Sequence, residues 1–228
     1  MANLKEIRNR ITSVSSTMQI TSAMKMVSAA KLKKAQDAIT ALKPYSEKLD
    51  ELIGVLSSGS AGIENNEYFR TNESNKILIV PITSNRGLCG AFNSNIIKET
   101  LRLKQTAFKD KTVEVLSIGK KGGDILSKSI HLKGRHDDLF DNLNFENSET
   151  VADLIMESYR EKEYNKIILI YNRFKNAATQ LVEVDNFLPV EKIIEKKEIK
   201  NFDTFFEPSE MEILKSLIPK SLKVKFYK

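Results

Sequence analysis

The first part of the chain has the hydrophobic pattern of one long helix. Residues 2–43 contain neither glycine nor proline, and a helix of that length is about 60 Å long. Apolar side chains recur at spacings of three and four residues, which is typical of a coiled-coil seam for one partner helix. This seam consists of Leu4, Ile7, Ile11, Val14 and Met18. We predict a shaft helix over residues 1–57, with a kink or an end at Pro44 and a resumption towards Ser57.

Beyond Met18 the regular seam dissolves, and small side chains surround the helix on every side. They are Thr21, Ser22, Ala23, Ser28, Ala29 and Ala30, with larger residues only at Ile20, Met24 and Val27. A slender helix surface makes no deep knobs for a fixed partner, so it suits close passage inside something wider.

A second pattern begins at Lys76, after a polar, turn-rich stretch over residues 58–75 that we expect to be a linker. Short apolar runs alternate with helical spacing over residues 76–200. Strands are predicted at 76–84, 112–119, 166–174 and 178–190, and helices at 90–105, around 123–128 and from Ser148. This alternation is typical of an α/β domain with a mainly parallel sheet, helices on both faces and an antiparallel edge.

The last stretch, residues 201–228, contains two helix-start signals. One is Ser209 after the turn at Pro208, and the other is Pro219, after which we expect a further helix to begin. We interpret this stretch as a return segment followed by the start of a C-terminal helix.

Charge changes the picture for one element only. The chain has a net charge of +6, and residues 1–44 contain eight basic and two acidic residues, which equals this whole surplus. A basic helix is compatible with nucleic-acid binding. Aromatic stacking residues are absent from it, however, and its aliphatic seam favours burial against protein.

Targeting signals and membrane spans are not evident. The apolar runs at 77–82 and 167–171 are of strand length, and the start MANLKEIRNR lacks the apolar core of a signal peptide. The single cysteine, Cys89, excludes an internal disulfide. We therefore expect a soluble protein that is not exported.

Catalytic motifs are weak. No Walker-type phosphate loop is present, and the loop Gly119–Asp124 is more readily explained as a strand-to-helix turn than as a phosphate site, although it keeps a nucleotide-dependent enzyme as the alternative. Cys89 has no histidine near it in sequence, which favours a buried structural thiol over a nucleophile. His131 and His136, with Asp137 and Asp138, lack a helical ligand spacing, which favours a solvated loop over a metal site. We expect no catalytic residue, no metal and no cofactor.

Three stretches together resemble the γ subunit of the rotary F-type ATP synthase. They are KEIRNRITSVSSTMQITSAMKMVSAAKLKKAQ near the start, TSNRGLCGAFN in the first strand-to-helix loop, and FFEPSEMEILKSLIP near the end. The resemblance implies a Rossmann-like domain beside a coiled-coil shaft. It also implies a non-catalytic central-stalk rotor that turns inside a ring of three α and three β subunits and couples transmembrane proton flow to ATP synthesis or hydrolysis.

The resemblance further implies partners and contact residues. The expected partners are α and β subunits at one copy per hexamer, the ε subunit and the membrane c-ring, with no nucleic acid, at the cytoplasmic face of the bacterial inner membrane as a peripheral protein. Contacts to acidic loops of the β subunits fall on Met24, Lys25, Lys31, Lys33, Lys34 and Arg86. The signature that docks the domain falls on Thr83, Gly87, Leu88, Cys89 and Gly90, and the stalk side falls on Glu207 and Pro208.

Two departures from the family pattern affect these expectations. Many relatives have an acidic residue before the arginine where this chain has Asn85. The family also carries a second long helix after a segment like LIPKSLKVKFYK, which pairs with the first helix, and this chain ends there. We therefore expect a truncated form whose seam needs another cover and which couples poorly.

Overall fold

The computed structural model describes residues 3–59, 66–176, 178–190, 207 and 209–228. The chain divides into two compact units. The first is Met1–Lys48 with Lys228, and the second is Leu49–Tyr227.

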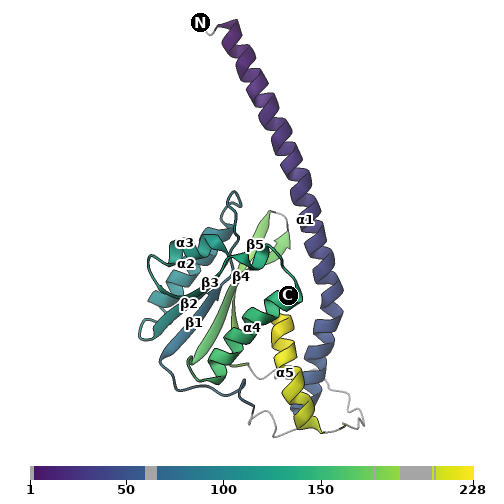
Figure 1. Ribbon diagram of the computed structural model, residues 1–228, viewed down its shortest axis with the longest axis vertical. Coiled ribbons are helices and arrows are strands. Elements are labelled where there is room, and N and C mark those ends of the chain that lie inside the picture. The colour runs from purple at the N-terminus through teal and green to yellow at the C-terminus, as the bar shows by residue number, and fades with distance from the viewer. Residues whose placement is uncertain (1–2, 60–65, 177, 191–206, 208) are drawn as a thin grey trace. The chain divides into compact units, whose positions relative to one another are not determined.

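Helix α1 runs without interruption from Leu4 to Gly59 and contains Pro44 (Figure 1). The expected end at Pro44 is therefore not found. A proline removes one backbone donor, and one missing bond does not end a helix of 56 residues. The last turns of α1 contribute Leu49, Ile53 and Leu56 to the core of the second unit, with exposed fractions of 2 to 7%.

The second unit is built on a five-stranded sheet with the order β3-β2-β1-β4-β5. Strands β1 (Lys76–Pro81), β2 (Thr112–Ile118), β3 (His131–His136) and β4 (Lys166–Asn176) are parallel, and β5 (Thr179–Leu188) pairs antiparallel with β4. The predicted parallel sheet with an antiparallel edge is confirmed.

Helices cover both faces of this sheet. Side chains alternate between the faces along each strand, and since those of the central strands are apolar, both faces need a cover. Leu78 and Val80 of β1 face a core shared with α4 (Phe145–Arg160) and α5 (Glu210–Tyr227). Ile77 and Ile79 face a core shared with α2 (Phe92–Gln105) and α3 (Lys120–Leu126). Figure 1 shows α4 and α5 together on one side of the strands.

Helix α5 is continuous through Pro219, so the prediction that a further helix begins after this proline is wrong. Hydrophobic contacts and ion pairs fasten α5 to the domain. Lys223 Nζ lies 2.7 Å from Glu149 Oε1 and 2.8 Å from Asp153 Oδ1, both on α4. Lys225 Nζ lies 2.9 Å from Asp185 Oδ2 on β5.

The described part of the expected linker, residues 66–75, consists of turns and irregular backbone fixed to the domain. Tyr68 is 5% exposed, and its carbonyl accepts a hydrogen bond from the Val190 amide at 2.7 Å. The Asn72 side-chain amide donates to the carbonyl oxygens of Tyr159 and Tyr164, at 2.9 and 3.0 Å. This stretch thus leads into β1 along a defined path.

Strand β3 lies where we expected a solvated loop, so that interpretation of residues 131–136 is wrong. It forms the edge of the sheet beyond β2, with a register shift between Val115 and Leu116. Over the described ranges, no helix is both long enough and apolar enough to span a bilayer.

Candidate partner-binding surfaces

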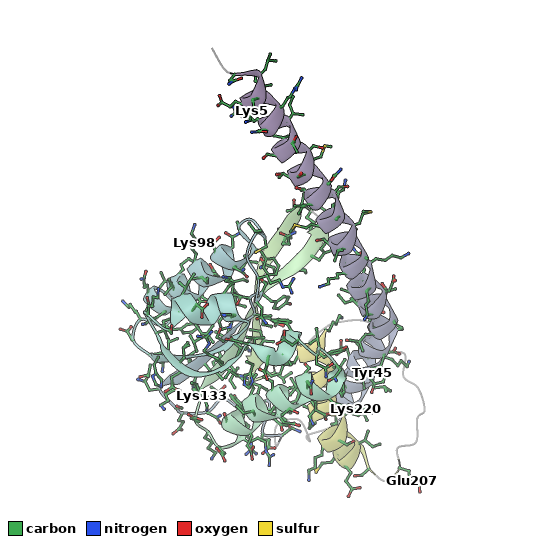
Figure 2. All side chains as sticks on the ribbon, turned by 45° about the horizontal axis from the view of Figure 1, so that its top comes forward. Lys5, Tyr45, Lys98, Lys133, Glu207 and Lys220 are labelled. Atoms are coloured by element: carbon green, nitrogen blue, oxygen red, sulfur yellow. The ribbon has the colours of Figure 1, made fainter. Side chains whose placement is uncertain are left out.

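The aliphatic seam of α1 is open to solvent. Successive residues of a helix are about 100° apart, which brings the seam residues into one stripe. Their exposed fractions run from 44% at Ile7 to 74% at Leu4. Figure 2 shows side chains projecting all around this part of α1, on which Lys5 is labelled. A stripe of this kind is suited to pairing with a helix or an apolar surface.

Threonines on the same helix direct their hydroxyl groups back to their own backbone. Each Oγ1 donates to the carbonyl oxygen four residues earlier, at distances of 2.6 to 3.1 Å. The threonines are Thr12, Thr17, Thr21 and Thr40. Because these donors are already used, the side chains offer mainly methyl groups to a neighbour.

The cations of α1 are distributed around the helix. At about 100° per residue, Lys31, Lys33 and Lys34 point in three different directions. All three are exposed, as is Lys25, and Met24 is 53% exposed. The predicted contact residues on α1 are therefore all accessible, and the lysines present positive charge on several sides of the helix.

A second accessible surface is the loop between β1 and α2, residues 83–91, which one asparagine organises. Asn93, in the first turn of α2, accepts a hydrogen bond from the Ser84 amide at 2.9 Å. Its amide nitrogen donates to Ser84 Oγ at 2.9 Å, to the Arg86 carbonyl at 3.3 Å and to Cys89 Sγ at 3.2 Å. The loop is thus held from its inner side at three positions.

The same loop is joined to the start of α3. Thr83 Oγ1 accepts from the Gly122 amide at 2.9 Å, Asn85 Oδ1 from the Lys120 amide at 2.9 Å, and the Ser84 carbonyl from the Lys121 amide at 3.2 Å. These N–H groups are the ones a phosphate would need. Because they are already paired, the loop Gly119–Asp124 acts as a strand-to-helix junction.

The predicted signature residues differ in accessibility. Thr83 is 1% exposed and belongs to the junction with α3, whereas Arg86, Gly87 and Gly90 are exposed. Leu88 is 99% exposed. Cys89 is an exposed free thiol, so the expectation of a buried thiol is wrong: its small neighbours belong to a projecting loop and do not cover it.

An ion cluster supports this junction from β3. Arg135 lies 2.8 Å from Asp124 of α3 and 2.6 Å from Asp137, and hydrogen bonding to Arg135 lowers the pKa of the Asp124 carboxyl. Asn85 Nδ2 in turn donates to the Asp137 carbonyl. The loop, α3 and the end of β3 therefore form one connected structure.

The histidine candidates do not converge. His131 and His136 begin and end β3, where they pair with Glu114 and Ile118 of β2, and these two positions are about 13 Å apart along the strand. Within the described ranges, no group of three or more His, Cys, Asp or Glu side chains is placed to hold a metal ion. Glu207 is exposed, and Pro208 lies outside the described residues.

Sequence reasoning did not identify Asn85 and Asn93 as the residues that shape the loop. The available signal was local: an asparagine in the first turn of a helix, after a glycine-rich loop, is well placed to bond backbone groups of that loop. The pattern indicates the residue type but not which groups it would contact.

Comparisons with known proteins agree over the whole chain. A family model described as ATP synthase matches residues 3–228. The ATP synthase gamma chain of Flavobacterium johnsoniae is 58% identical over 228 residues, and that of Geotalea uraniireducens is 35% identical over 229 residues. Each alignment covers 100% of this chain and 79% of the relative.

Solved structures give the same architecture. The central stalk and c-ring structure of the Tetrahymena thermophila mitochondrial ATP synthase contains a chain that is 26% identical, with a TM-score of 0.53, covering 83% of this chain and 89% of that one. A chain of the Euglena gracilis mitochondrial ATP synthase rotor, 20% identical with a TM-score of 0.56, shares the fold, covering 96% of this chain and 79% of that one.

Proposed function

The chain belongs to the ATP synthase gamma chain family, and on this basis we propose that helix α1 is the shaft on which the catalytic subunits act. The chain is a non-catalytic central-stalk subunit of a rotary ATP synthase. Its part in coupling proton flow to ATP synthesis or hydrolysis is mechanical, and the chemistry takes place on other subunits.

The observation that carries the shaft proposal is the exposure of α1 along its whole free length. Over residues 3–41 nearly every side chain is exposed, including the five aliphatic residues of the seam. A single helix with this much apolar surface is marginal alone in water. Neighbouring subunits that surround it would remove this surface from water.

The proposed contacts to acidic loops of the β subunits are Met24, Lys25, Lys31, Lys33, Lys34 and Arg86. The exposure of these residues and the spread of the lysines around α1 support this. Three identical β subunits around one asymmetric shaft meet three different faces of it. Differential contact free energy then favours a different conformation in each subunit, and rotation moves this bias from one to the next.

The remaining partners follow from the same proposal. The α/β domain, with Glu207 and Pro208 on its stalk side, would connect to the ε subunit and the membrane c-ring. The signature from Thr83 to Gly90 would dock the domain on the coil. We place the chain at the cytoplasmic face of the bacterial inner membrane, held there as a peripheral subunit by its complex; the bacterial gamma chains among its relatives support this.

Assembly with purified subunits tests the shaft proposal. The chain is mixed with α and β subunits of the same source, and the product is weighed by native mass spectrometry. We expect one copy of the chain with three α and three β subunits. Failure to assemble, or several copies per hexamer, would contradict the proposal.

A matched pair of variants tests whether the seam of α1 forms the contact with the α and β subunits. Ile11→Asp places a charge in the seam, and Ile125→Asp places one on an exposed isoleucine of α3. Burying an unpaired carboxylate is strongly unfavourable, so only I11D should reduce assembly. Equal assembly of both variants would remove the seam from the interface.

A further inference from the structure

The tip of the loop between β1 and α2 presents a large apolar side chain in an unfavourable backbone conformation. Leu88 is 99% exposed and has a φ of 60°. Left-handed backbone is costly for residues with a β-carbon, and asparagine and glycine tolerate it better. The Leu88 side chain itself contacts almost nothing within the described fold.

The surrounding loop fixes this conformation. Asn93 bonds to Ser84, Arg86 and Cys89 on both sides of Leu88, and the Phe92 amide donates to the Cys89 carbonyl at 3.2 Å. Ser84 Oγ also donates to the Arg86 carbonyl at 2.6 Å. Leu88 is therefore displayed on a preorganised loop, which reduces the entropy lost on binding.

Two glycines, Gly87 and Gly90, leave the backbone near Leu88 without covering side chains. A β-carbon added at Gly87 or Gly90 would meet no atom within 4 Å. Gly90 has a φ of 58°, a left-handed conformation that favours glycine at this position. Gly87 does not have a left-handed φ, so its backbone conformation does not require glycine. The fold itself would accept a side chain at position 87. Its absence leaves the base of Leu88 open to close approach from outside the chain.

We propose that Leu88 is an apolar anchor that inserts into a socket on a subunit of the catalytic ring. This inference rests on the proposed function, since it places Leu88 beside the contact made by Arg86, and it assigns Leu88 to the ring in place of the docking contact proposed above for the signature. Residues 83–91 include one cation, Arg86, and no acidic residue, and the adjoining start of α3 adds Lys120 and Lys121. The chemistry that fits is a protein surface with an apolar socket bordered by carboxylates.

The anchor predicts opposite effects on stability and on binding. In Leu88→Asn the backbone strain is relieved, so the melting temperature of the full chain should stay the same or rise by a few degrees. Burial of a leucine side chain is lost, so dissociation from the ring should become about ten- to hundredfold faster. Leu143→Asn removes another exposed leucine, 52% exposed, and serves as the matched control.

The experiment measures dissociation of fluorescently labelled full chain from its complex with purified α and β subunits, displaced by excess unlabelled chain. Faster dissociation of L88N alone, with an unreduced melting temperature, supports the anchor. Equal dissociation of wild type, L88N and L143N overturns it and leaves the proposed function intact, whereas failure of the wild type to bind the ring overturns both. Leu88-dependent binding to anionic phospholipid vesicles, with unchanged ring dissociation, would assign the anchor to a membrane and also overturn it.

Discussion

Two tyrosines fasten helix α4 and the start of β4 through their hydroxyl groups. Tyr159, 1% exposed, donates to the Arg70 carbonyl at 2.6 Å, and Tyr164, fully buried, donates to Glu114 Oε2 at 2.6 Å. Burial raises the pKa of Tyr159 from its ordinary value of 10.0 to about 12, and burial followed by the bond to Glu114 raises that of Tyr164 further. Both side chains therefore stabilise the fold as neutral donors.

Alkaline unfolding tests this role of Tyr159. The unfolded tyrosine releases its proton near pH 10 and the folded one near pH 12. The contribution of neutral Tyr159 to the free energy of unfolding is therefore complete below pH 10 and is lost as the pH rises towards 12. Tyr159→Phe should cost about 1 kcal/mol at pH 8 through the lost hydrogen bond. By pH 11 wild type should lose about 1.4 kcal/mol relative to the variant. Parallel urea-unfolding free energies for wild type and Y159F between pH 8 and 11 would contradict this.

At the scale of elements, the hydrophobic pattern was sufficient for continuously buried strands and for a helix with regular apolar spacing. Strands β1 and β4 contain continuous apolar runs that are buried, and helix α1 has apolar residues at regular helical intervals although they are exposed. All three elements were predicted. Strand β3, HLKGRH, was not, because a polar edge strand with one neighbour and a glycine has little apolar signal. The two prolines led us to predict helix boundaries that are absent from the described helices. Each proline removes one backbone hydrogen bond, and this loss is outweighed by the packing of α5 at Pro219 and by the length of α1 at Pro44.

The candidate surfaces were predictable in type but not in geometry. Exposure of the α1 cations follows from a polar helix surface, and position 86 was identified by resemblance. The direction of Leu88 and the exposure of Cys89 depend on hydrogen bonds from Asn93 to Ser84 and Cys89, and hydrophobic periodicity does not specify these partners. A local pattern does not contain that information.

The junction between β2 and α3 gives a prediction at this scale. Gly119 has a φ of 89°, and a β-carbon there would lie 2.0 Å from the Thr83 carbonyl oxygen. Gly119→Ala should lower the free energy of unfolding by about 3 kcal/mol or more, because backbone has to move. Gly87→Ala meets open space and should change it by less than about 0.5 kcal/mol. Similar urea midpoints for both variants would show that the junction adapts easily.

At the scale of the whole molecule, the charge is unevenly divided. The surplus of +6 resides in residues 1–44, and the remaining residues contain equal numbers of acids and bases. A charge concentrated on one element acts mainly on the rate of encounter with an oppositely charged partner, and salt screens it. The shaft proposal therefore implies association with the ring that depends on ionic strength.

The triple variant K31Q/K33Q/K34Q tests this distribution. Association with purified α and β subunits, followed by stopped-flow fluorescence, should slow about tenfold at 20 mM salt and less than about twofold at 300 mM. The control K98Q/K109Q/K128Q removes the same charge from exposed positions of the second unit and should have a smaller effect. Equal slowing by both would attribute the effect to net charge alone.

Helix α1 belongs to both units of the chain, and this has a mechanical consequence. Its last turns lie in the core through Leu49, Ile53 and Leu56, and the same unbroken hydrogen-bonded backbone continues to Leu4. A torque on the residues before Pro44 would act on these buried residues through the covalently continuous backbone of α1.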